Sequence, residues 1–391
     1  MREFVKLTAS FKLDGEIPDI FSLYKQIVNE LLDYASFKNI SSFKKLKAER
    51  YYELREKYPN LPSHYIYTAC QMACSIYKSF RKLKRKGKAK GDKPQFKKDV
   101  IMLDEKLFSL NLNNLFVSIA TPNGRVKLKL IHRKYHERFR DWKVGQAWLI
   151  KKDYELFLNV VFSKDIEVEK PIDVIGVDVN ENNVTIAKLN GFGKKVTREK
   201  VIRTVYFLKR RKIQSKIKVG KTRRKLLVKY SGRERNRILD IYHKAANWIV
   251  EEALETGSAI TLENLKNIRK KIKYSKKMNG RLHRWSFRKL QLIIEYKAKL
   301  NGVPIIYVNA RGTSSLCPIC GAKLSPNGHR ILKCKRCGLI ADRDIIGAWN
   351  IRLRGLKQID VASPVPAESL PMKTEGGKET KHHKMSSLLE R

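Results

Sequence analysis

Four cysteines form two Cys-x-x-Cys pairs late in the chain. Cys317 and Cys320 make the first pair, Cys334 and Cys337 make the second, and thirteen residues separate the pairs. Each pair can present two thiolates to one tetrahedral Zn²⁺, and four protein ligands leave no open position for a substrate. The alternative is two small disulfides, which would need an oxidising compartment, and the sequence has no export signal. We therefore predict a structural zinc site.

Three acids predict a second and different metal site. Asp178 and Glu263 each end an apolar stretch, and Asp344 stands at the start of a helical pattern, two residues after Asp342. Carboxylates gathered at strand ends suit Mg²⁺ or Mn²⁺ rather than Zn²⁺. Two such ions can activate a water and stabilise the leaving oxygen of a phosphodiester. Singly, these acids could be a turn former, a surface acid and a helix cap, but together they predict nuclease chemistry.

An α/β sheet is needed to bring these acids together. Apolar stretches over residues 173–179, 258–262 and 303–308 predict buried strands, and helical patterns over 238–253 and 285–300 alternate with them. Alternation of this kind indicates crossover connections, which place functional acids at one edge of the sheet. Residues 184–189 read as a partner strand behind a tight turn, and the helix at Asp344 is expected to run to about Leu353.

The N-terminal half shows another pattern. Residues 3–11 read as a strand, and three helical patterns follow over residues 17–36, 42–58 and 64–83. Short strands separated by turns then fill residues 100–168, which favours a small antiparallel barrel with a helical insertion. Cys70 and Cys74 lie one helical turn apart, and we interpret them as core residues rather than metal ligands.

The charge of the chain predicts a polyanionic partner. Its 391 residues hold 84 Lys and Arg against 38 Asp and Glu, a net charge of +46, and a surface adapted only for solubility does not need so uneven a ratio. Three basic segments are candidates for contact with nucleic-acid phosphates: a loop or frayed helix end over residues 81–98, an exposed basic helix or helix pair over 203–237, and a basic loop over 266–284. For residues 81–98 a solvated linker is the alternative. The basic residues expected to bind nucleic acid are Arg81, Lys82, Lys84, Arg85, Lys86, Lys209, Arg210, Arg211, Lys221, Arg223, Arg224, Lys270 and Lys271. The sequence has no run of 18 apolar residues that could span a membrane.

The motifs taken in series resemble one family. They are Leu61-Pro62-Ser63, Gly176-Val-Asp178-Val-Asn180, Leu262-Glu263-Asn264-Leu265, Trp285-Ser286-Phe287, Glu295-Tyr296-Lys297, Thr313-Ser314, the two cysteine pairs, each followed by glycine, and Asp342-Arg343-Asp344 with Asn350-Ile351. The series is similar to the TnpB (OrfB) proteins of insertion sequences, which are relatives of the type V CRISPR effectors. It covers residues 1 to about 354.

The resemblance implies an α+β multidomain architecture. A wedge β-barrel domain would comprise residues 1–15 and 100–170, with a helical recognition domain over 16–99. A RuvC-like, RNase H-like nuclease domain would comprise residues 171–310 and 341–355 and hold a zinc ribbon over 311–340. Residues 356–391 are expected to form a disordered tail, because they mix Pro, Ser, Gly, Glu and Lys.

The resemblance also implies an activity. Family members use a guide RNA transcribed from the end of the insertion sequence and cut double-stranded DNA beside a short adjacent motif. Asp178, Glu263 and Asp344 match the three catalytic acids, with Asp342 as a candidate additional acid, Mg²⁺ or Mn²⁺ as the catalytic cofactor and Zn²⁺ as the structural one. Such a protein is expected in the cytoplasm of a prokaryotic cell, associated with the nucleoid.

One departure from the family leaves other functions open. The family usually continues Asp-Arg-Asp-x-Asn-Ala-Ala-x-Asn-Ile, whereas Ile346 and Gly347 here replace the first Asn and an Ala. Loss of that Asn would weaken hydrogen bonding near the metals. A domesticated nucleic-acid-binding regulator without nuclease activity is therefore one alternative. A transposase that acts directly in DNA recombination is another, although the chain shows no clear tyrosine-nucleophile arrangement.

Overall fold

The computed structural model describes residues 2–89, 91–265 and 274–359. The chain divides into two compact units, one of Phe4–Asp165 and one of Met1–Glu3 with Ile166–Arg391. We call them the N-terminal and C-terminal units and describe each by itself. The predicted contact residues Lys270 and Lys271, and the tail from residue 360, lie outside the described residues. No helix in the described part of the chain is long and apolar enough to cross a membrane.

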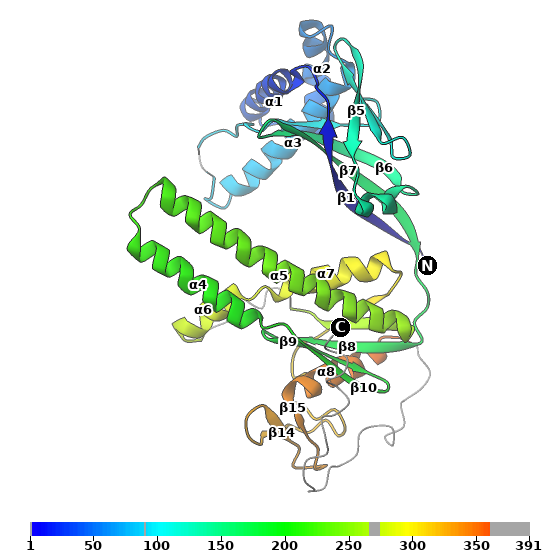
Figure 1. The fold of residues 1–391 in the computed structure, drawn as a ribbon, viewed down its shortest axis with the longest axis vertical. Coiled ribbons are helices and arrows are strands. Elements are labelled where there is room, and N and C mark those ends of the chain that lie inside the picture. Colours follow the sequence, from blue (N-terminus) through cyan, green and yellow to red (C-terminus); the bar gives the residue numbers. More distant parts are fainter. Residues whose placement is uncertain (1, 90, 266–273, 360–391) are drawn as a thin grey trace. The chain divides into compact units, whose positions relative to one another are not determined.

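The N-terminal unit is built on a nearly closed seven-stranded sheet with the order β2-β6-β7-β1-β5-β4-β3 (Figure 1). The strands are β1 (Arg2–Asp14), β2 (Val100–Leu103), β3 (Phe108–Asn111), β4 (Phe116–Thr121), β5 (Gly124–Ile131), β6 (Lys143–Lys152) and β7 (Glu155–Glu167). A 3₁₀ turn, η1, covers Lys134–Phe139. Towards the end of β1, buried Ala9, Phe11 and Leu13 alternate with more exposed residues, as expected for a strand with one face on the core.

Three helices lie between β1 and β2 in the sequence: α1 (Ile20–Phe37), α2 (Phe43–Lys57) and α3 (Ser63–Lys84). The side chain of Asp19 caps α1 by accepting from the backbone N–H of Ser22. Cys70 and Cys74 on α3 are buried in the apolar core, and burial raises the pKa of the Cys70 thiol to about 12. Their interpretation as core residues is confirmed, because such a thiol is neither ionised nor exposed.

The C-terminal unit contains a five-stranded sheet in the order β10-β9-β8-β11-β12. The strands are β8 (Asp173–Val179), β9 (Asn183–Lys188), β10 (Gly191–Val196), β11 (Ser258–Glu263) and β12 (Ile305–Val308). β8 and β12 pair in parallel with β11, whereas β9 pairs antiparallel with β8 and with β10. The three predicted strands and the crossover connection between β8 and β11 are therefore present, but β12 begins two residues later than predicted and is half-buried except at Val308.

Helices cover both faces of this sheet. Ile175 and Val177 of β8 pack with α5 (Lys221–Glu255) and α7 (Phe287–Leu300) in one core. Gly176 points to the other face, where α8 (Arg343–Leu356) crosses the strand. A Cβ at position 176 would lie 2.2 Å from the carbonyl oxygen of Ala348, so only glycine allows α8 to lie this close to β8.

The basic segment over residues 203–237 forms a helix pair, as predicted. It comprises most of α4 (Glu199–Lys216) and the first half of α5, whose second half contains the predicted apolar face. The prediction of a loop over 266–284 was wrong in its second part, because Lys276–Arg284 form helix α6. Most of the side chains described on α6 are polar, so no apolar periodicity marked it.

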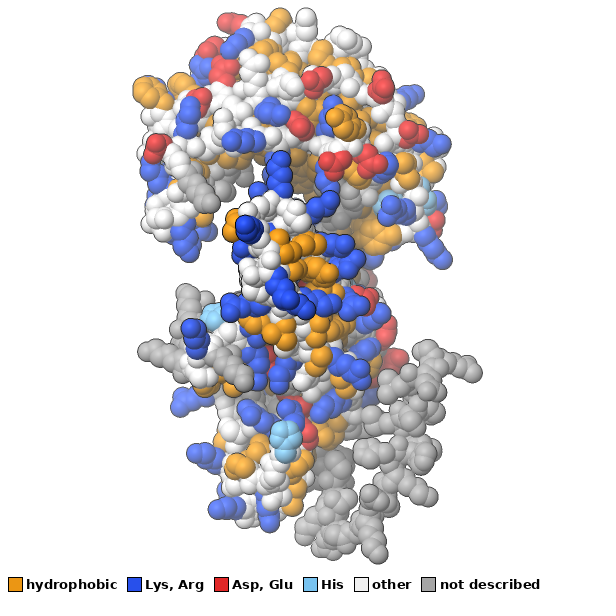
Figure 2. Space-filling model, turned by 60° about the vertical axis from the view of Figure 1, so that its left-hand side comes forward, with side chains coloured by type: hydrophobic (Ala, Val, Ile, Leu, Met, Phe, Trp, Pro, Cys, Tyr) orange, Lys and Arg blue, Asp and Glu red, His pale blue; other side chains and the backbone are white. Residues whose placement is uncertain are grey.

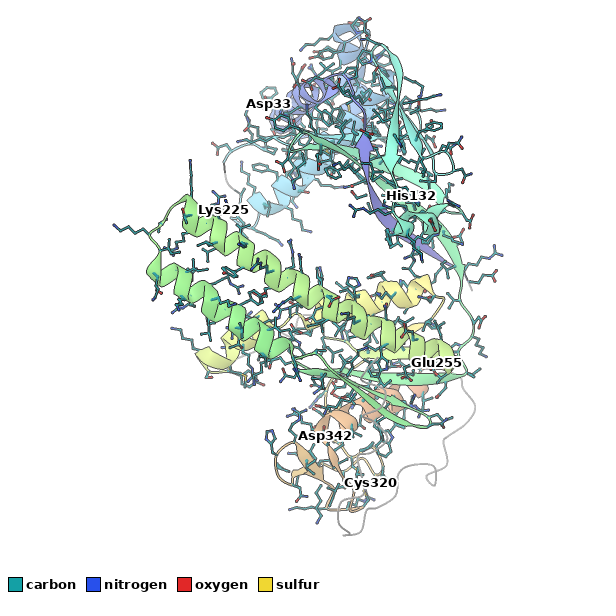
Figure 3. All side chains as sticks on the ribbon, in the orientation of Figure 1. Asp33, His132, Lys225, Glu255, Cys320 and Asp342 are labelled. Carbon is teal, nitrogen blue, oxygen red and sulfur yellow. The ribbon has the colours of Figure 1, made fainter. Side chains whose placement is uncertain are left out.

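The zinc-ribbon segment carries three very short strands, β13 (Ser325–Pro326), β14 (Ile331–Lys333) and β15 (Ile340–Asp342). β14 pairs antiparallel with both of its neighbours, and β15 leads directly into α8. Figure 3 marks Cys320 in this segment and Asp342 at the point where α8 begins.

Candidate functional site

Two of the three predicted acids stand at the ends of neighbouring strands. β8 and β11 run in parallel with Val177 opposite Leu262, so Asp178 and Glu263 are the next residues along each strand. Because parallel strands end at the same edge, both carboxylates reach the same side of the sheet.

The third acid comes from the first turn of α8. Asp342 is the N-cap of this helix, and its Oδ1 accepts a hydrogen bond from the backbone N–H of Asp344 at 2.7 Å. This cap fixes the turn that directs Asp344 toward the strand ends, and Asp344 itself is only 3% exposed. Asp342 thus has a capping role and does not line the pocket described next.

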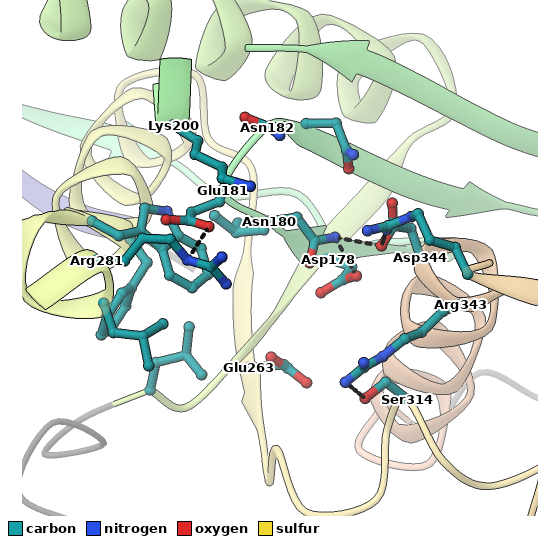
Figure 4. Close-up of a pocket in the computed structure, with 17 residues that line it drawn as sticks. Asp178, Asn180, Glu181, Asn182, Lys200, Glu263, Arg281, Ser314, Arg343 and Asp344 are labelled. Atoms are coloured by element: carbon teal, nitrogen blue, oxygen red, sulfur yellow. Dashed lines mark hydrogen bonds and ion pairs between the residues drawn. The ribbon is translucent and has the colours of Figure 1, made fainter. Parts of the chain in front are cut away.

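The three acids line one pocket of about 400 Å³. Figure 4 shows Asp178, Glu263 and Asp344 facing a common space between β8, β11 and the start of α8. The pocket is also lined by Asn180, Glu181, Asn182, Lys200, Arg281, Trp285, Phe287, Ser314, Arg330 and Arg343, among others. Acids separated by long stretches of sequence therefore share one space, as the strand-end argument predicted.

Asn180 connects two of the acids. Its side-chain Nδ2 donates to Asp178 Oδ2 at 2.7 Å and to Asp344 Oδ1 at 3.1 Å. Burial, together with the charges of Glu263 and Asp344, raises the pKa of Asp178 to about 7, although the Asn180 hydrogen bond opposes this shift. The protein therefore concentrates negative charge here, which a bound cation would neutralise.

Cationic side chains already approach Asp344 from two elements. Lys194 of β10 places its Nζ 3.2 Å from Asp344 Oδ2, and Arg330 of the ribbon donates to Oδ1. Oδ2 is buried and accepts no hydrogen bond within the described residues, in spite of the nearby ammonium group. A buried carboxylate oxygen with this unused capacity suits a metal ligand.

Glu263 is held from the loop that precedes the first cysteine. Thr313 donates its hydroxyl to Glu263 Oε1, and Asn350 of α8 donates to the carbonyl oxygens of Thr313 and Leu316, each at 2.8 Å. Burial raises the pKa of Glu263, while the Thr313 hydrogen bond opposes the shift. This loop ties Glu263, α8 and the cysteine segment into one assembly.

The four cysteines form a compact ligand set. Among the described residues, they are the group of His, Cys, Asp or Glu whose ligand atoms all lie within 4.8 Å of one another. The Sγ atoms of Cys317 and Cys337, and of Cys320 and Cys334, are 3.5 Å apart, too far for a disulfide bond. Four thiols at this separation fit tetrahedral Zn²⁺.

The carboxylate oxygens of Asp178, Glu263 and Asp344 lie farther apart than the cysteine sulfurs. Unlike those sulfurs, they do not all lie within 4.8 Å of one another. A pair of ions about 4 Å apart accommodates such a spread, since neither ion has to contact all three acids. The hard oxygen donors of Asp178, Glu263 and Asp344 fit Mg²⁺ or Mn²⁺ in type.

The predicted nucleic-acid contacts are mostly exposed. Lys82, Lys84, Arg85 and Lys86 extend from the end of α3 in the N-terminal unit. In the C-terminal unit, Lys209 and Arg211 on α4 and Lys221 and Arg224 on α5 are exposed. Figure 2 shows many Lys and Arg side chains, with apolar ones between them, on the face in view. Arg210 is different, because it pairs with the buried Glu234 and is therefore partly structural.

Four residues of the site had no role assigned from the sequence. Asn180 and Thr313 carry the family resemblance, but their types alone do not reveal that they bind carboxylates. Lys194 lies on a strand that was not predicted, and Arg330 reaches Asp344 from a ribbon loop in which its backbone is left-handed, with φ of 65°. Contacts of this kind depend on the fold, and the sequence carried no local signal for them.

Known proteins match this chain over most of its length. A family model described as "Cas12f1-like, TNB domain" matches residues 287–351, and one described as "Uncharacterized protein MJ0013 family" matches residues 20–118. The chain is 39% identical over 249 residues to a TnpB-like protein of Methanocaldococcus jannaschii, a match that covers 60% of this chain and 88% of that protein. The chain belongs to the TnpB-like family. The resemblance drawn from the motifs is thereby confirmed.

Further relatives extend this TnpB-like assignment. A second TnpB-like protein of the same organism is 26% identical over 309 residues, covering 77% of this chain and 70% of that one. The CRISPR-associated endodeoxyribonuclease Cas12f2 of a Micrarchaeota archaeon is 28% identical, covering 57% of this chain and 46% of that one. The cryo-EM structure of a Cas12f1–sgRNA–target DNA complex matches with a TM-score of 0.57 at 16% identity, covering 85% of this chain and 82% of that one. The TnpB-like chain therefore has a Cas12f-like α+β fold.

Proposed function

We propose that this chain is an RNA-guided DNA endonuclease encoded by an insertion sequence, with a RuvC-like nuclease domain that hydrolyses phosphodiesters by divalent-metal catalysis. Its partners would be a guide RNA derived from the end of the insertion sequence and double-stranded target DNA. The observation that carries the proposal is the convergence of Asp178, Glu263 and Asp344 on one pocket. Relatives named as endodeoxyribonucleases, and a structural neighbour solved with guide RNA and target DNA, support it.

Asp178, Glu263 and Asp344 would hold the catalytic Mg²⁺ or Mn²⁺. When bound, such ions lower the pKa of a water and stabilise the charge that develops on a leaving phosphodiester oxygen. Thr313 keeps Glu263 in place, and the N-cap at Asp342 keeps Asp344 in place. Arg343 is exposed at the pocket and Lys200 lines it, so both are suited to bind phosphate oxygens of the substrate.

Sequence recognition is assigned to the guide in this proposal. Base pairing between guide and target would read the sequence, while the protein binds the backbone and one short adjacent motif. The exposed basic residues on α3, α4 and α5 would supply backbone contacts. The four-cysteine ribbon would hold structural Zn²⁺ and supply Arg330 and the Thr313 loop to the pocket.

The test is cleavage of a matched DNA target by the purified protein with its co-purified RNA. Wild type is expected to cut only when Mg²⁺ or Mn²⁺ is present, and Asp178→Ala is expected to abolish cutting while RNA binding stays near normal. Sequencing of the co-purified RNA would identify the guide. RNA binding without any metal-dependent cutting by wild type would instead support the nuclease-inactive regulator. Strand joining would support the transposase.

A further inference from the structure

The first turn of α8 has no polar side chain at position 346, where the family usually has an Asn. Ile346 is fully buried and packs with Cys317, Leu324 and Cys334 in the core of the ribbon. Gly347 has no side chain, and its Cα faces the Asp178 carboxylate. Hydrogen bonds to the acids must therefore come from elsewhere in the fold.

Asn180 supplies them from the turn that follows β8. It follows β8 directly, and its single side-chain amide group donates to both Asp178 and Asp344. These two acids belong to different elements, β8 and α8, so the amide bridges the sheet and the helix.

The position of the Asn180 side chain is fixed by its backbone. Its N–H donates to the carbonyl oxygen of Asn183 at 2.9 Å across the turn between β8 and β9, and the residue is partly buried. A side chain anchored in this way is organised before a ligand arrives.

Asn180 differs from the other partners of Asp344 because its side chain carries no charge. Lys194 and Arg330 are cations, so they repel a divalent ion and compete with it for the carboxylate. An amide donor does neither, and it can keep one oxygen of each acid in place while the other oxygen binds an ion. It also reduces the repulsion between two carboxylates that have to stay close.

We propose that Asn180 is a positioning residue that sets the spacing of Asp178 and Asp344 for divalent-cation binding. Its hydrogen bonds to the two acids come from the β8–β9 turn, while Ile346 of α8 packs into the ribbon core. This inference rests on the proposed function in so far as the bound cation is the catalytic one. Asn180 acts through the two acids.

The test measures Mn²⁺ binding to the full chain freed of RNA, by isothermal titration calorimetry and by electron paramagnetic resonance of the bound ion. Asn180→Ala is expected to weaken Mn²⁺ binding 10- to 100-fold, the range usual for groups that orient metal ligands. Asn301→Ala is the matched control, because Asn301 is an exposed cap at the end of α7, and it should leave Mn²⁺ affinity unchanged. Mn²⁺ binding that is present in wild type and lost in Asp178→Ala is the binding at the acid pocket.

Three further measurements decide the outcome. Thermal unfolding shows whether Asn180→Ala is folded, and Asn180→Ser, which keeps one short donor, should recover part of the affinity. In cleavage assays the Asn180→Ala variant should need 10- to 100-fold more Mn²⁺ for half-maximal rate and approach the wild-type rate at saturation, unlike Asp178→Ala. Unchanged Mn²⁺ affinity in folded Asn180→Ala would overturn the proposal. If wild type binds Mn²⁺ but cuts no DNA, the proposed function fails, while the affinity comparison still decides the role of Asn180.

Discussion

Gly347 brings the first turns of α8 against the Asp178 carboxylate. A Cβ built at this position would lie 2.9 Å from Asp178 Oδ2 and 3.2 Å from Cγ, closer than side chains normally approach. The residue that departs from the family pattern therefore matches the local space of this chain. The neighbouring departure, Ile346, is equally well accommodated in the apolar core of the ribbon.

Gly347→Ala is predicted to impair metal binding without unfolding the protein. Alanine would gain up to about 1 kcal/mol of helix propensity, but its methyl group would displace the Asp178 carboxylate from its position. We expect Mn²⁺ affinity to fall about tenfold or more, with a melting temperature close to that of wild type. Gly232→Ala on α5 is the matched control for stability and metal binding, because nothing lies within 4 Å of its added Cβ. Equal Mn²⁺ affinity in Gly347→Ala and wild type would contradict this account.

The Asp178 carboxyl makes stability depend on pH in the absence of Mg²⁺ and Mn²⁺. Its folded-state pKa of about 7 lies above its ordinary value of 3.8, so between these values the folded state binds more protons than the unfolded state. The free energy of unfolding should therefore fall as pH rises from about 4 to 7. Asp178→Asn removes this dependence, so it should equal wild type in stability near pH 4 and exceed it above pH 7.

Above pH 7 the free energy of unfolding of Asp178→Asn should exceed that of wild type by at most about 4 kcal/mol, because each unit of pKa shift corresponds to about 1.4 kcal/mol. Denaturant unfolding of both proteins at several pH values, with zinc retained and no Mg²⁺ or Mn²⁺ added, measures it. If the difference in free energy of unfolding between Asp178→Asn and wild type stayed constant from pH 4 to 8, burial of an ionised Asp178 could not be the cause of that difference.

At this scale, residue type predicted the acids but not their partners. Asp178 and Glu263 could be singled out because each ends an apolar stretch, and Asp344 because it opens a helical one. Asn180 could not be assigned, because its contact with Asp344 joins residues that only the folded sheet and helix bring together. The predicted site roles themselves stay predictions until the variants are measured.

At the scale of elements, strong patterns were read correctly and weak ones were not. β8 and β11 are continuous apolar runs, and α1 and α3 have regular apolar periodicity, so each was predicted close to its observed bounds. β10 contains two glycines and two lysines and was not predicted, and β2, with only four residues, was not singled out among the short strands predicted over 100–168. Both are held by pairing to a neighbouring strand rather than by their own sequence.

The ribbon and the acid pocket are joined through their connecting loops, which predicts that zinc loss disturbs both. Cys334→Ser should remove zinc, and with it binding free energy of about 10 kcal/mol or more that holds such ribbons folded. Arg330 and Thr313 would then lose their fixed positions, so Mn²⁺ binding at the acids should weaken as well. Zinc content by mass spectrometry and Mn²⁺ affinity by calorimetry measure the two effects.

Cys74→Ala serves as the control for that experiment, because Cys74 is a core residue of the N-terminal unit. It should lower stability modestly and leave both zinc content and Mn²⁺ affinity unchanged. If Cys334→Ser lost its zinc and yet kept full Mn²⁺ affinity, the ribbon would have no part in positioning the acids.

At the scale of the whole molecule, the net charge of +46 predicts strongly salt-dependent binding of nucleic acid. A protein that makes 6 to 10 phosphate contacts loses about 10³ to 10⁵ in affinity between 50 and 200 mM salt, because bound counterions are released. Replacing Lys221, Arg223 and Arg224 together by alanine should lower the slope of log affinity against log salt by about 3. Filter binding of a structured RNA over a salt series measures the slope.

Lys244→Ala is the control for the salt experiment. Lys244 lies on the same helix α5 and is exposed, but it already pairs with Asp240, so it should contribute less to counterion release. A triple variant with the slope of wild type would show that the start of α5 does not contact phosphates.

Overall charge was the most directly predictable property, since it needs no fold, whereas the assignment of individual basic residues to a nucleic acid stays a prediction.

The order of the acids along the chain has a consequence for biosynthesis. Asp178 and Glu263 leave the ribosome well before Asp344, and the helix that carries Asp344 completes the pocket from the far side of the sheet. A nascent chain stalled or proteolysed ahead of α8 would already expose most of its positive charge but would lack a finished metal pocket. If the full chain has the proposed nuclease activity, incomplete translation products would bind polyanions but could not cleave them.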